Sequence, residues 1–244
     1  MKKIIAASSI ALLLPLTAQA EQYWADNSIS LLHGSDYKMI PAGQTSDAAV
    51  MTLEHVSGHS WGGVFLFIDR VQNGGSQYRE TYGELSPTIY LKQFNDSIIK
   101  SINAEFTYEF GSSTTGKGSD TFSQDNYLAG VGLSWNIPGM DFFKTTIYHA
   151  WNTGDKRQQD DQLTLSYGWH KGNVNVDGFL DYTPSQKSGV ESELNFTPQI
   201  TYNIGPALGL KSKLKVGVEY AYWQNKFAST TDQNNLSLLL KWHL

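Results

Sequence analysis

The segment Leu236-Ser-Leu-Leu-Leu-Lys-Trp-His-Leu244 ends the chain and decides the fold. Large apolar side chains occupy every second position of it, from 236 to 244, and Ser237, Leu239, Lys241 and His243 occupy the positions between. Successive side chains of a β-strand point to opposite faces, so the segment has one fully apolar face. A strand of a transmembrane barrel has this pattern, because its outer face meets hydrocarbon and its inner face meets water. The segment therefore predicts a membrane-spanning strand.

The beginning of the chain has the pattern of an export signal. Lys2 and Lys3 precede an apolar run over residues 4–16, and Ala18-Gln-Ala20 supplies the small residues that a signal peptidase requires. The run is shorter than the ~20 residues of a spanning helix. We therefore predict a signal peptide over residues 1–20 and a barrel domain over residues 21–244, with no transmembrane helix.

The composition restricts the possible functions. The formal net charge is −5, and removal of Lys2 and Lys3 with the signal peptide leaves the rest of the chain more acidic. Nucleic-acid binding requires a basic surface and is not expected. The sequence has no cysteine, and a closed barrel does not need disulfides. Aromatic residues at 13% and 22 glycines fit a chain of many strands and tight turns.

Alternation with a period of two recurs along the chain. In residues 98–110, for example, Ile102, Phe106 and Phe110 share one face, and Asn103 and Glu105 lie on the other. The pattern predicts twelve strands, with ends uncertain by a few residues. They cover residues 24–33, 47–57, 61–70, 80–92, 97–110, 124–136, 142–152, 160–170, 173–183, 191–204, 211–225 and 234–244.

The predicted connections alternate between long polar segments, such as 34–46 and 111–123, and short turns, such as Lys171-Gly172. Short periplasmic turns, longer extracellular loops and an even number of strands are typical of outer-membrane barrels. The predicted fold is therefore an all-β antiparallel transmembrane β-barrel of about 12 strands in the bacterial outer membrane. Pro87 and Pro198 fall inside strands, where a bulge or a kink would accommodate them.

The predicted inner face carries both acidic and aromatic side chains. Charged side chains should face the lumen, because hydrocarbon does not solvate them. Phe65, Phe67 and Phe179 have the same parity as these charges, although water-facing positions do not require phenylalanine. They pack either against one another or against a flat ligand. In the second case, neighbouring carboxylates would accept hydrogen bonds from the hydroxyl and amino groups of the ligand. The residues leave both alternatives open.

His55-Val-Ser57 offers an alternative function. A histidine and a serine two residues apart share one face of a strand, which is the geometry that an outer-membrane phospholipase uses at its lipid-facing side. No orienting amide or carboxylate is near them in the sequence, so we do not expect an enzyme. The histidines have no metal-ligand spacing, and no cofactor is expected.

The segment Met51–Arg70, followed by Gly83-Glu-Leu-Ser-Pro87, resembles the Tsx/OmpK family of nucleoside-specific outer-membrane channels. Phe65, Phe67 and Asp69 match an aromatic-x-aromatic-x-Asp strand of that family, and Glu84 and Pro87 match a Glu-x-x-Pro strand. The segment Trp24–Tyr37 is similar to its first strand. The likeness covers about residues 22–92.

The resemblance implies a monomeric twelve-stranded barrel with a narrow lumen that passes nucleosides along aromatic and ionisable side chains. Its partners would be nucleosides or related small solutes, outer-membrane lipid, the barrel-assembly machinery and, at the outer loops, a phage or a bacteriocin. We expect a passive channel, and the alternatives are a lipid-modifying hydrolase and a plugged barrel that acts through its loops. The predicted substrate-binding residues are Phe65, Phe67, Asp69, Tyr82, Glu84, Tyr90, Glu105, Tyr148 and Phe179.

Overall fold

A computed structural model describes residues 21–39, 44–73, 78–115, 120–153, 159–185 and 190–244. The predicted signal peptide lies outside the described residues. The strands are β1 (Gln22–Met39), β2 (Gln44–His59), β3 (Gly62–Gln72), β4 (Arg79–Gln93), β5 (Ile99–Thr115), β6 (Asp120–Trp135), β7 (Phe142–Trp151), β8 (Gln159–Lys171), β9 (Val174–Thr183), β10 (Glu193–Asn203), β11 (Leu214–Gln224) and β12 (Gln233–His243). Two short 3₁₀ helices, η1 (Pro206–Leu208) and η2 (Lys226–Ala228), lie in the connections on either side of β11.

The strands form one closed antiparallel barrel in which every strand pairs with its neighbours in the sequence and β12 pairs with β1. The closing seam runs from Ser28 opposite His243 to Gly34 opposite Ser237. Because the sheet closes on itself, no strand of it is left with an unpaired edge. The predicted fold class is therefore confirmed.

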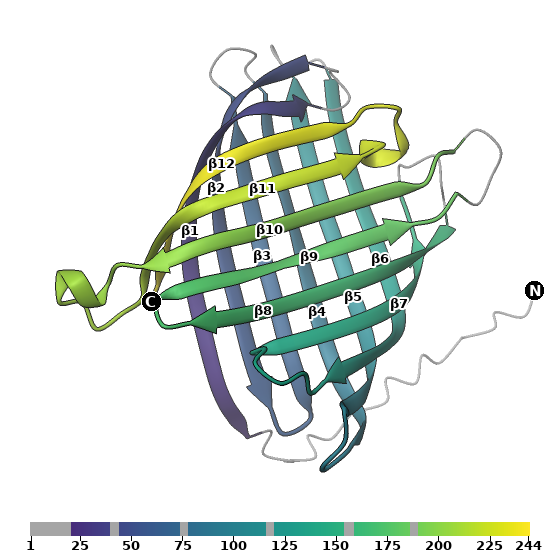
Figure 1. The fold of residues 1–244 in the computed structure, drawn as a ribbon. Helices are drawn as coiled ribbons and strands as arrows, with labels where there is room; N and C mark the ends of the chain where they lie inside the picture. Colours follow the sequence, from purple (N-terminus) through teal and green to yellow (C-terminus); the bar gives the residue numbers. More distant parts are fainter. Residues whose placement is uncertain (1–20, 40–43, 74–77, 116–119, 154–158, 186–189) are drawn as a thin grey trace, which may run out of the picture.

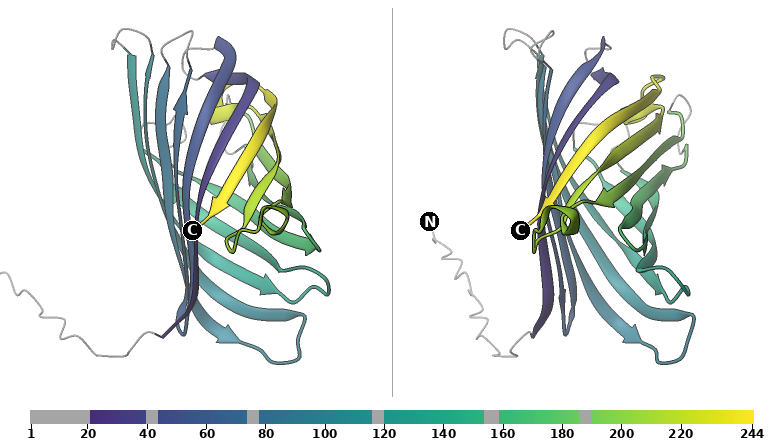
Figure 2. Two further views of the ribbon diagram at one scale, coloured as in Figure 1. Left: turned by 90° about the vertical axis from the view of Figure 1, so that its left-hand side faces the viewer. Right: turned by 60° about the vertical axis from the view of Figure 1, so that its left-hand side comes forward.

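The two walls of the barrel cross each other in projection (Figures 1 and 2). Strands β1–β6 run steeply, and β7–β12 run obliquely across them, as tilted strands do on opposite sides of a barrel. The start of β1, the end of β12, the β2–β3 turn and η1 belong to one end of the barrel, which is called the periplasmic end below. Segment η2 belongs to the opposite, extracellular end.

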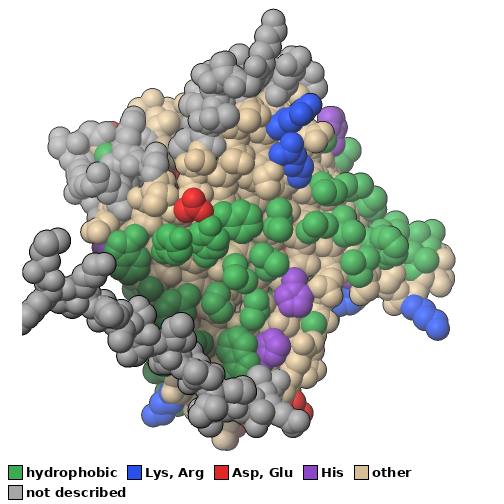
Figure 3. Space-filling view, turned by 180° about the vertical axis from the view of Figure 1, so that it is seen from behind, with side chains coloured by type: hydrophobic (Ala, Val, Ile, Leu, Met, Phe, Trp, Pro, Cys, Tyr) green, Lys and Arg blue, Asp and Glu red, His purple; other side chains and the backbone are tan. Residues whose placement is uncertain are grey.

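Burial in this barrel is inverted relative to a soluble protein. The side chains with almost no exposed area are polar, with Asn103 and Ser237 at 0% and Glu105 at 1%, whereas Leu238 is 71% exposed and Ile147 is 67% exposed. Figure 3 shows exposed apolar side chains gathered across the face that it draws. This arrangement suits a barrel in lipid with a polar lumen. No helix among the described residues is long and apolar enough to cross a membrane.

The strands extend beyond several of the predicted limits. β1 continues to Met39 and β5 to Thr115, so parts of two segments predicted as loops belong to the sheet. Neither proline produces a bulge, because the pairing of β4 with β5 continues in the same register on both sides of Pro87, and that of β10 with β11 does so around Pro198. At Pro87 the Thr107 hydroxyl donates to the Ser86 hydroxyl, which links the two strands where the backbone ladder is interrupted.

Candidate functional site in the barrel lumen

The strand pairing identifies which side chains face the lumen. Residues directly opposite each other in an antiparallel pair share a face. Thr52 lies opposite Asp69, and Asp69 lies opposite Tyr82. The Thr52 hydroxyl donates to the Asp69 carboxylate over 2.6 Å. These three side chains therefore lie together on the inner wall formed by β2, β3 and β4.

An aromatic ladder lies on that wall. It consists of Phe65 and Phe67 on β3 and Tyr82 on β4. The ring centroids are 5.7 Å apart for the two phenylalanines and 5.8 Å apart for Phe67 and Tyr82. Phe65 remains 36% exposed. Part of this apolar surface is thus exposed, and part packs against itself; contact with a flat solute stays a prediction.

Three carboxylates gather next to the ladder. Glu84 lies opposite Glu109 in the β4–β5 pair, and both carboxylates interact electrostatically with Asp181 of β9. β9 is not a neighbour of β4 or β5 in the sheet, so this group, called the acidic cluster below, joins different parts of the wall.

Each carboxylate of the acidic cluster accepts a hydrogen bond from a neutral donor. The donors are the Tyr82 hydroxyl for Glu84 at 2.7 Å, the Asn126 amide for Glu109 at 2.9 Å and the Thr164 hydroxyl for Asp181 at 2.6 Å. Tyr82 therefore connects the aromatic ladder to the acidic cluster.

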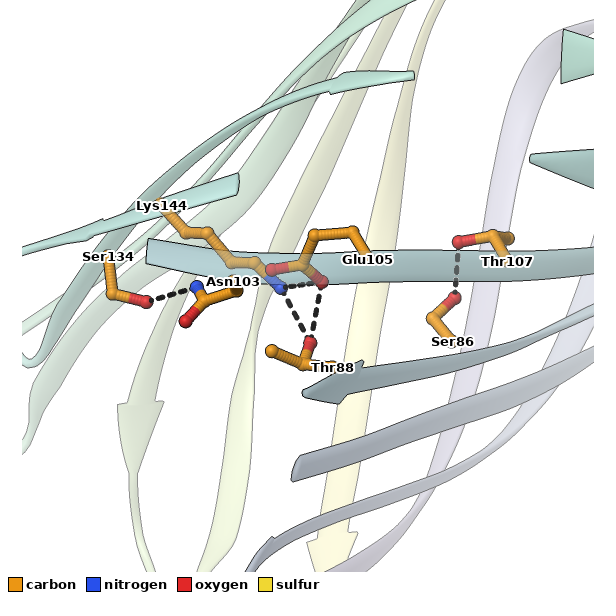
Figure 4. A network of polar contacts seen from close by, with 7 residues as sticks. All are labelled: Ser86, Thr88, Asn103, Glu105, Thr107, Ser134 and Lys144. Atoms are coloured by element: carbon orange, nitrogen blue, oxygen red, sulfur yellow. Dashed lines mark hydrogen bonds and ion pairs between the residues drawn. The ribbon is translucent and has the colours of Figure 1, made fainter. Parts of the chain in front are cut away.

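Glu105 belongs to a separate network (Figure 4). Its carboxylate accepts hydrogen bonds from the Thr88 hydroxyl at 2.6 Å and from the Lys144 ammonium at 2.7 Å. Lys144 also donates to Thr88. Asn103 on the same strand donates to the Ser134 hydroxyl. This network joins β4, β5, β6 and β7 and suits wall packing better than solute contact.

The remaining predicted site residues do not join the ladder. Tyr148 on β7 is 7% exposed and packs with Leu128 and Ala150 in an apolar cluster of the wall. Tyr90 lies opposite Asn103, and Phe179 lies opposite Thr197. The nine residues therefore do not form one cluster, and contact of Tyr148 with a substrate stays a prediction.

A second charged group lies in the periplasmic half of the lumen. Lys241 forms an ion pair with Glu54 at 3.0 Å and interacts with Asp177 and Glu219. Lys241 therefore compensates part of the negative charge of these three carboxylates. Lys215 lies opposite Lys241 in the β11–β12 pair and adds a second cation.

Segment η2 covers part of the extracellular end. The Lys226 ammonium is buried, donates to Gln233 at 2.7 Å and to the Lys38 carbonyl at 3.2 Å, and lies 4.7 Å from the centroid of the Trp223 ring. Burial lowers the pKa of Lys226 to about 8. Phe227 adopts a left-handed backbone conformation, and its amide donates to Glu193.

Sequence reasoning placed Glu109 and Asp181 in the lumen and missed their part in the site. The signal was present in the β4–β5 hairpin, whose register places Glu84 beside Glu109. Contact with Asp181 depends on closure of the barrel, which no local pattern describes. Trp24 lies opposite Gly58 on the inward register, and its indole fills the space where a Gly58 side chain would lie. No group of metal-ligating side chains occurs among the described residues.

Comparisons with known proteins find solved structures of porins that share the fold of this chain. No protein-family model matches the sequence, and no curated protein does. A solved structure of the KdgM porin in complex with disordered oligogalacturonate matches with a TM-score of 0.51 and 13% identity, over 88% of this chain and 98% of that one. The NanC porin matches with a TM-score of 0.51 and 12% identity, over 89% of this chain and all of its own.

The protein is an outer-membrane β-barrel. At these identities the similarity to the porins shows a shared fold, and the compared structures are channels and not enzymes. None of these comparisons tests the resemblance to the nucleoside channels, which remains a prediction from residues 22–92. His55 and Ser57 lie on the outer face of β2 and take no part in the lumen.

Proposed function

We propose that this barrel is a passive channel for nucleosides and similar small polar aromatic solutes. The observation that carries the proposal is the aromatic ladder of Phe65, Phe67 and Tyr82, which leads into the acidic cluster of Glu84, Glu109 and Asp181. The resemblance of residues 22–92 to the Tsx/OmpK family supports the same solute class.

The two parts of the site complement the two parts of a nucleoside. A planar base stacks on aromatic side chains, and ribose hydroxyls and exocyclic amines donate hydrogen bonds to carboxylates. Asp69 lies beside Tyr82 and adds an acceptor at the level of the ladder. Each contact is weak and solvent-accessible, and several weak sites in series allow a solute both to enter and to leave.

The charge of the lumen disfavours acidic solutes. Among the described residues, inward-facing carboxylates outnumber inward-facing lysines. The carboxylates are Asp26, Glu54, Asp69, Glu80, Glu84, Glu105, Glu109, Asp160, Asp177, Asp181, Glu193 and Glu219, and the lysines are Lys144, Lys215, Lys226 and Lys241. A polyanion such as the oligogalacturonate named for the KdgM porin would be repelled. Neutral or cationic aromatic solutes would not.

Planar-bilayer recordings test the solute class. We expect a small conductance that adenosine and thymidine block reversibly at millimolar concentration, and that galacturonate oligomers do not block. Phe65→Ala with Phe67→Ala should weaken the block by about tenfold, which corresponds to about 1.4 kcal/mol and to the loss of one stacking surface. Phe106→Ala removes an outward-facing phenylalanine and should leave the block unchanged. Currents that are insensitive to nucleosides in the parent protein would reject the proposal.

Liposome swelling separates the channel from a plugged barrel that acts through its loops. A channel admits small sugars and nucleosides into proteoliposomes and makes them swell, whereas a plugged barrel does not. If the proteoliposomes swell but nucleosides do not block the current, the protein is a channel and the proposed specificity for nucleosides is wrong.

A further inference from the structure

A chain of four polar side chains lies on the outer face of the barrel, where the strands should be apolar. The Nδ1 atom of His55 lies 2.8 Å from Oδ1 of Asn27, and its Nε2 atom lies 3.0 Å from Oγ of Ser57. The Nε2 atom of His59 lies 3.0 Å from the same hydroxyl. The His59 ring stacks on the indole of Trp61 with centroids 5.1 Å apart.

The hydrogen bonds define one consistent arrangement of protons. The Asn27 carbonyl oxygen can only accept, so His55 carries its proton on Nδ1, and its Nε2 accepts the proton of the Ser57 hydroxyl. His59 then donates its Nε2 proton to the Ser57 oxygen. An amide orients an imidazole, and the imidazole is positioned as a base for a hydroxyl.

The pairing of β1 with β2 supplies the residue that the sequence did not reveal. Asn27 lies directly opposite His55, and Ala25 lies directly opposite Ser57. The backbone carbonyl of Asn27 accepts a hydrogen bond from the backbone amide of Leu244, so the closing seam of the barrel holds the main chain at Asn27. Ser57 itself is 3% exposed, and the rings of His55 and His59 each lie 3.0 Å from its hydroxyl, so an ester reaches this oxygen only when one of the two rings turns aside.

The location of the serine suits a lipid ester. Trp61 lies in the β2–β3 turn at the periplasmic end, where aromatic side chains mark the membrane interface. β2 ends at His59 and Trp61 lies in the turn, so Ser57 is only two strand residues from the turn, and the tilt of about 40° places its hydroxyl about 5–7 Å further into the membrane than the turn. The headgroup region is only about 5–7 Å thick, so Ser57 lies near the boundary with the hydrocarbon, where the acyl esters of glycerolipids lie.

We propose that Ser57, His55 and Asn27 form an esterase site that cleaves acyl esters of membrane lipids. Ser57 is the nucleophile, His55 is the general base and acid, and Asn27 is a positioning residue that acts through His55. The site is independent of the lumen, because these side chains lie on the opposite face of the strands from Glu54 and Asp69.

The reaction balances with water as the second reactant. The Ser57 oxygen forms a bond to the ester carbonyl carbon while its proton passes to Nε2 of His55. The bond between that carbon and the alcohol oxygen breaks, and His55 returns the proton to the departing alcohol. Water then attacks the acyl-serine, His55 takes and returns a proton in the same way, and a fatty acid leaves. His59 is available to donate to the carbonyl oxygen once the serine proton has moved to His55.

Covalent labelling of the folded, full-length barrel tests the nucleophile. In detergent micelles a fluorophosphonate probe should label the parent protein at Ser57, and Ser57→Ala should reduce labelling to background. His33→Ala changes an outward histidine further along β1 and should label like the parent. Unchanged heat-modifiable gel mobility of each variant confirms that it is folded.

Fatty-acid release from vesicles of a fluorogenic phosphatidylethanolamine tests the activity itself. Ser57→Ala should abolish the release and leave the single-channel conductance unchanged, so failure of the esterase and failure of the channel are distinguishable. Asn27→Ala should lower kcat at least tenfold with little change in KM, and Asn27→Asp should restore most of it, because a carboxylate can also orient the imidazole. A folded parent protein that neither reacts with the probe nor releases fatty acid would overturn the proposal.

Discussion

At the residue scale, Glu105 shows how a carboxylate is accommodated in a barrel wall. Its side chain is almost completely removed from solvent and accepts hydrogen bonds from Thr88 and Lys144. Gly132 provides its space, because a Cβ atom there would lie 2.6 Å from the Glu105 carboxylate. Burial of a charge is tolerated only when a partner and hydrogen bonds compensate it, and this site supplies both.

Removal of Lys144 should therefore expose the cost of burying Glu105. Lys144→Met leaves the carboxylate without its cation, and we expect a loss of about 1–3 kcal/mol in the free energy of unfolding, because Lys144 is itself partly solvated. This loss is measured by urea-induced unfolding of the protein in phospholipid vesicles, with tryptophan fluorescence as the signal. Lys171→Met, at the β8–β9 turn, is the matched control and should change little. If Glu105→Gln with Lys144→Met is as unstable as Lys144→Met alone, the ion-pair explanation is wrong.

At the element scale, β12 divides its side chains between two environments. Its outward leucines, Leu236, Leu238 and Leu240, are exposed to the surroundings of the barrel, whereas Ser237 and Lys241 are buried in the lumen. Ser237 also accepts or donates a hydrogen bond at 2.8 Å with the Tyr37 hydroxyl across the closing seam. The strand thus contributes lipid contact on one face and barrel closure on the other.

A charged side chain on the outward face of β12 should destabilise the barrel more strongly the deeper it lies in the membrane. Leu238→Arg, at the middle of the strand, should lower the free energy of unfolding by about 2–4 kcal/mol, because an arginine at the bilayer midplane is poorly solvated. Leu208→Arg is the control, since Leu208 is similarly exposed but lies in η1 outside the sheet. Both variants are compared in the same vesicle unfolding assay. Equal effects would mean that β12 does not lie in hydrocarbon at this point.

Segment η2 makes stability depend on pH through Lys226. Burial lowers its pKa in the folded protein from 10.5 to about 8, so between these values the unfolded chain binds more protons. The contribution of this group to the free energy of unfolding therefore rises with pH from about 8 to about 10.5, by at most about 1.4 kcal/mol per pH unit, and is flat below pH 8. Lys226→Met removes this contribution. We expect the free energy of unfolding of the variant minus that of the parent to fall as the pH rises from about 8 to about 10.5, because only the parent gains stability from Lys226 in this range. A constant difference would contradict the assignment.

How much of the structure could be predicted from the sequence depends on how far apart in the chain the interacting residues lie. Alternation within one strand is local, so it identified twelve strands and the inward direction of Phe65, Phe67 and Asp69. Contacts between strands depend on their register. The sequence predicts the ends of each strand only to within a few residues, so it does not determine the register. For this reason the partnership of Asn27 with His55 escaped sequence reasoning. Contacts across the lumen, such as Glu84 with Asp181, require the closed barrel.

At the scale of the whole molecule, closure places charge in a narrow, water-filled space. Residues that are far apart in the sequence add their fields within one lumen whose walls have a low dielectric constant. The acidic cluster interacts with other carboxylates, whereas Glu54 in the periplasmic half is paired with Lys241. The net effect is a lumen in which negative charge dominates, so the electrostatics of the channel belong to the barrel and not to any one strand.

Ion selectivity tests this whole-molecule property independently of any solute. In a bilayer with a KCl gradient, the parent channel should have a reversal potential that favours K⁺ over Cl⁻, because the carboxylates of the lumen attract cations and repel anions. Glu84→Gln with Glu109→Gln removes two charges from the acidic cluster and should lower the K⁺/Cl⁻ permeability ratio severalfold. Asp161→Asn removes a carboxylate from the outer face, where Asp161 pairs with His149, and should leave the ratio unchanged. An anion-selective parent channel would show that the lysines Lys215 and Lys241 at the periplasmic end, and not the acidic cluster, control permeation.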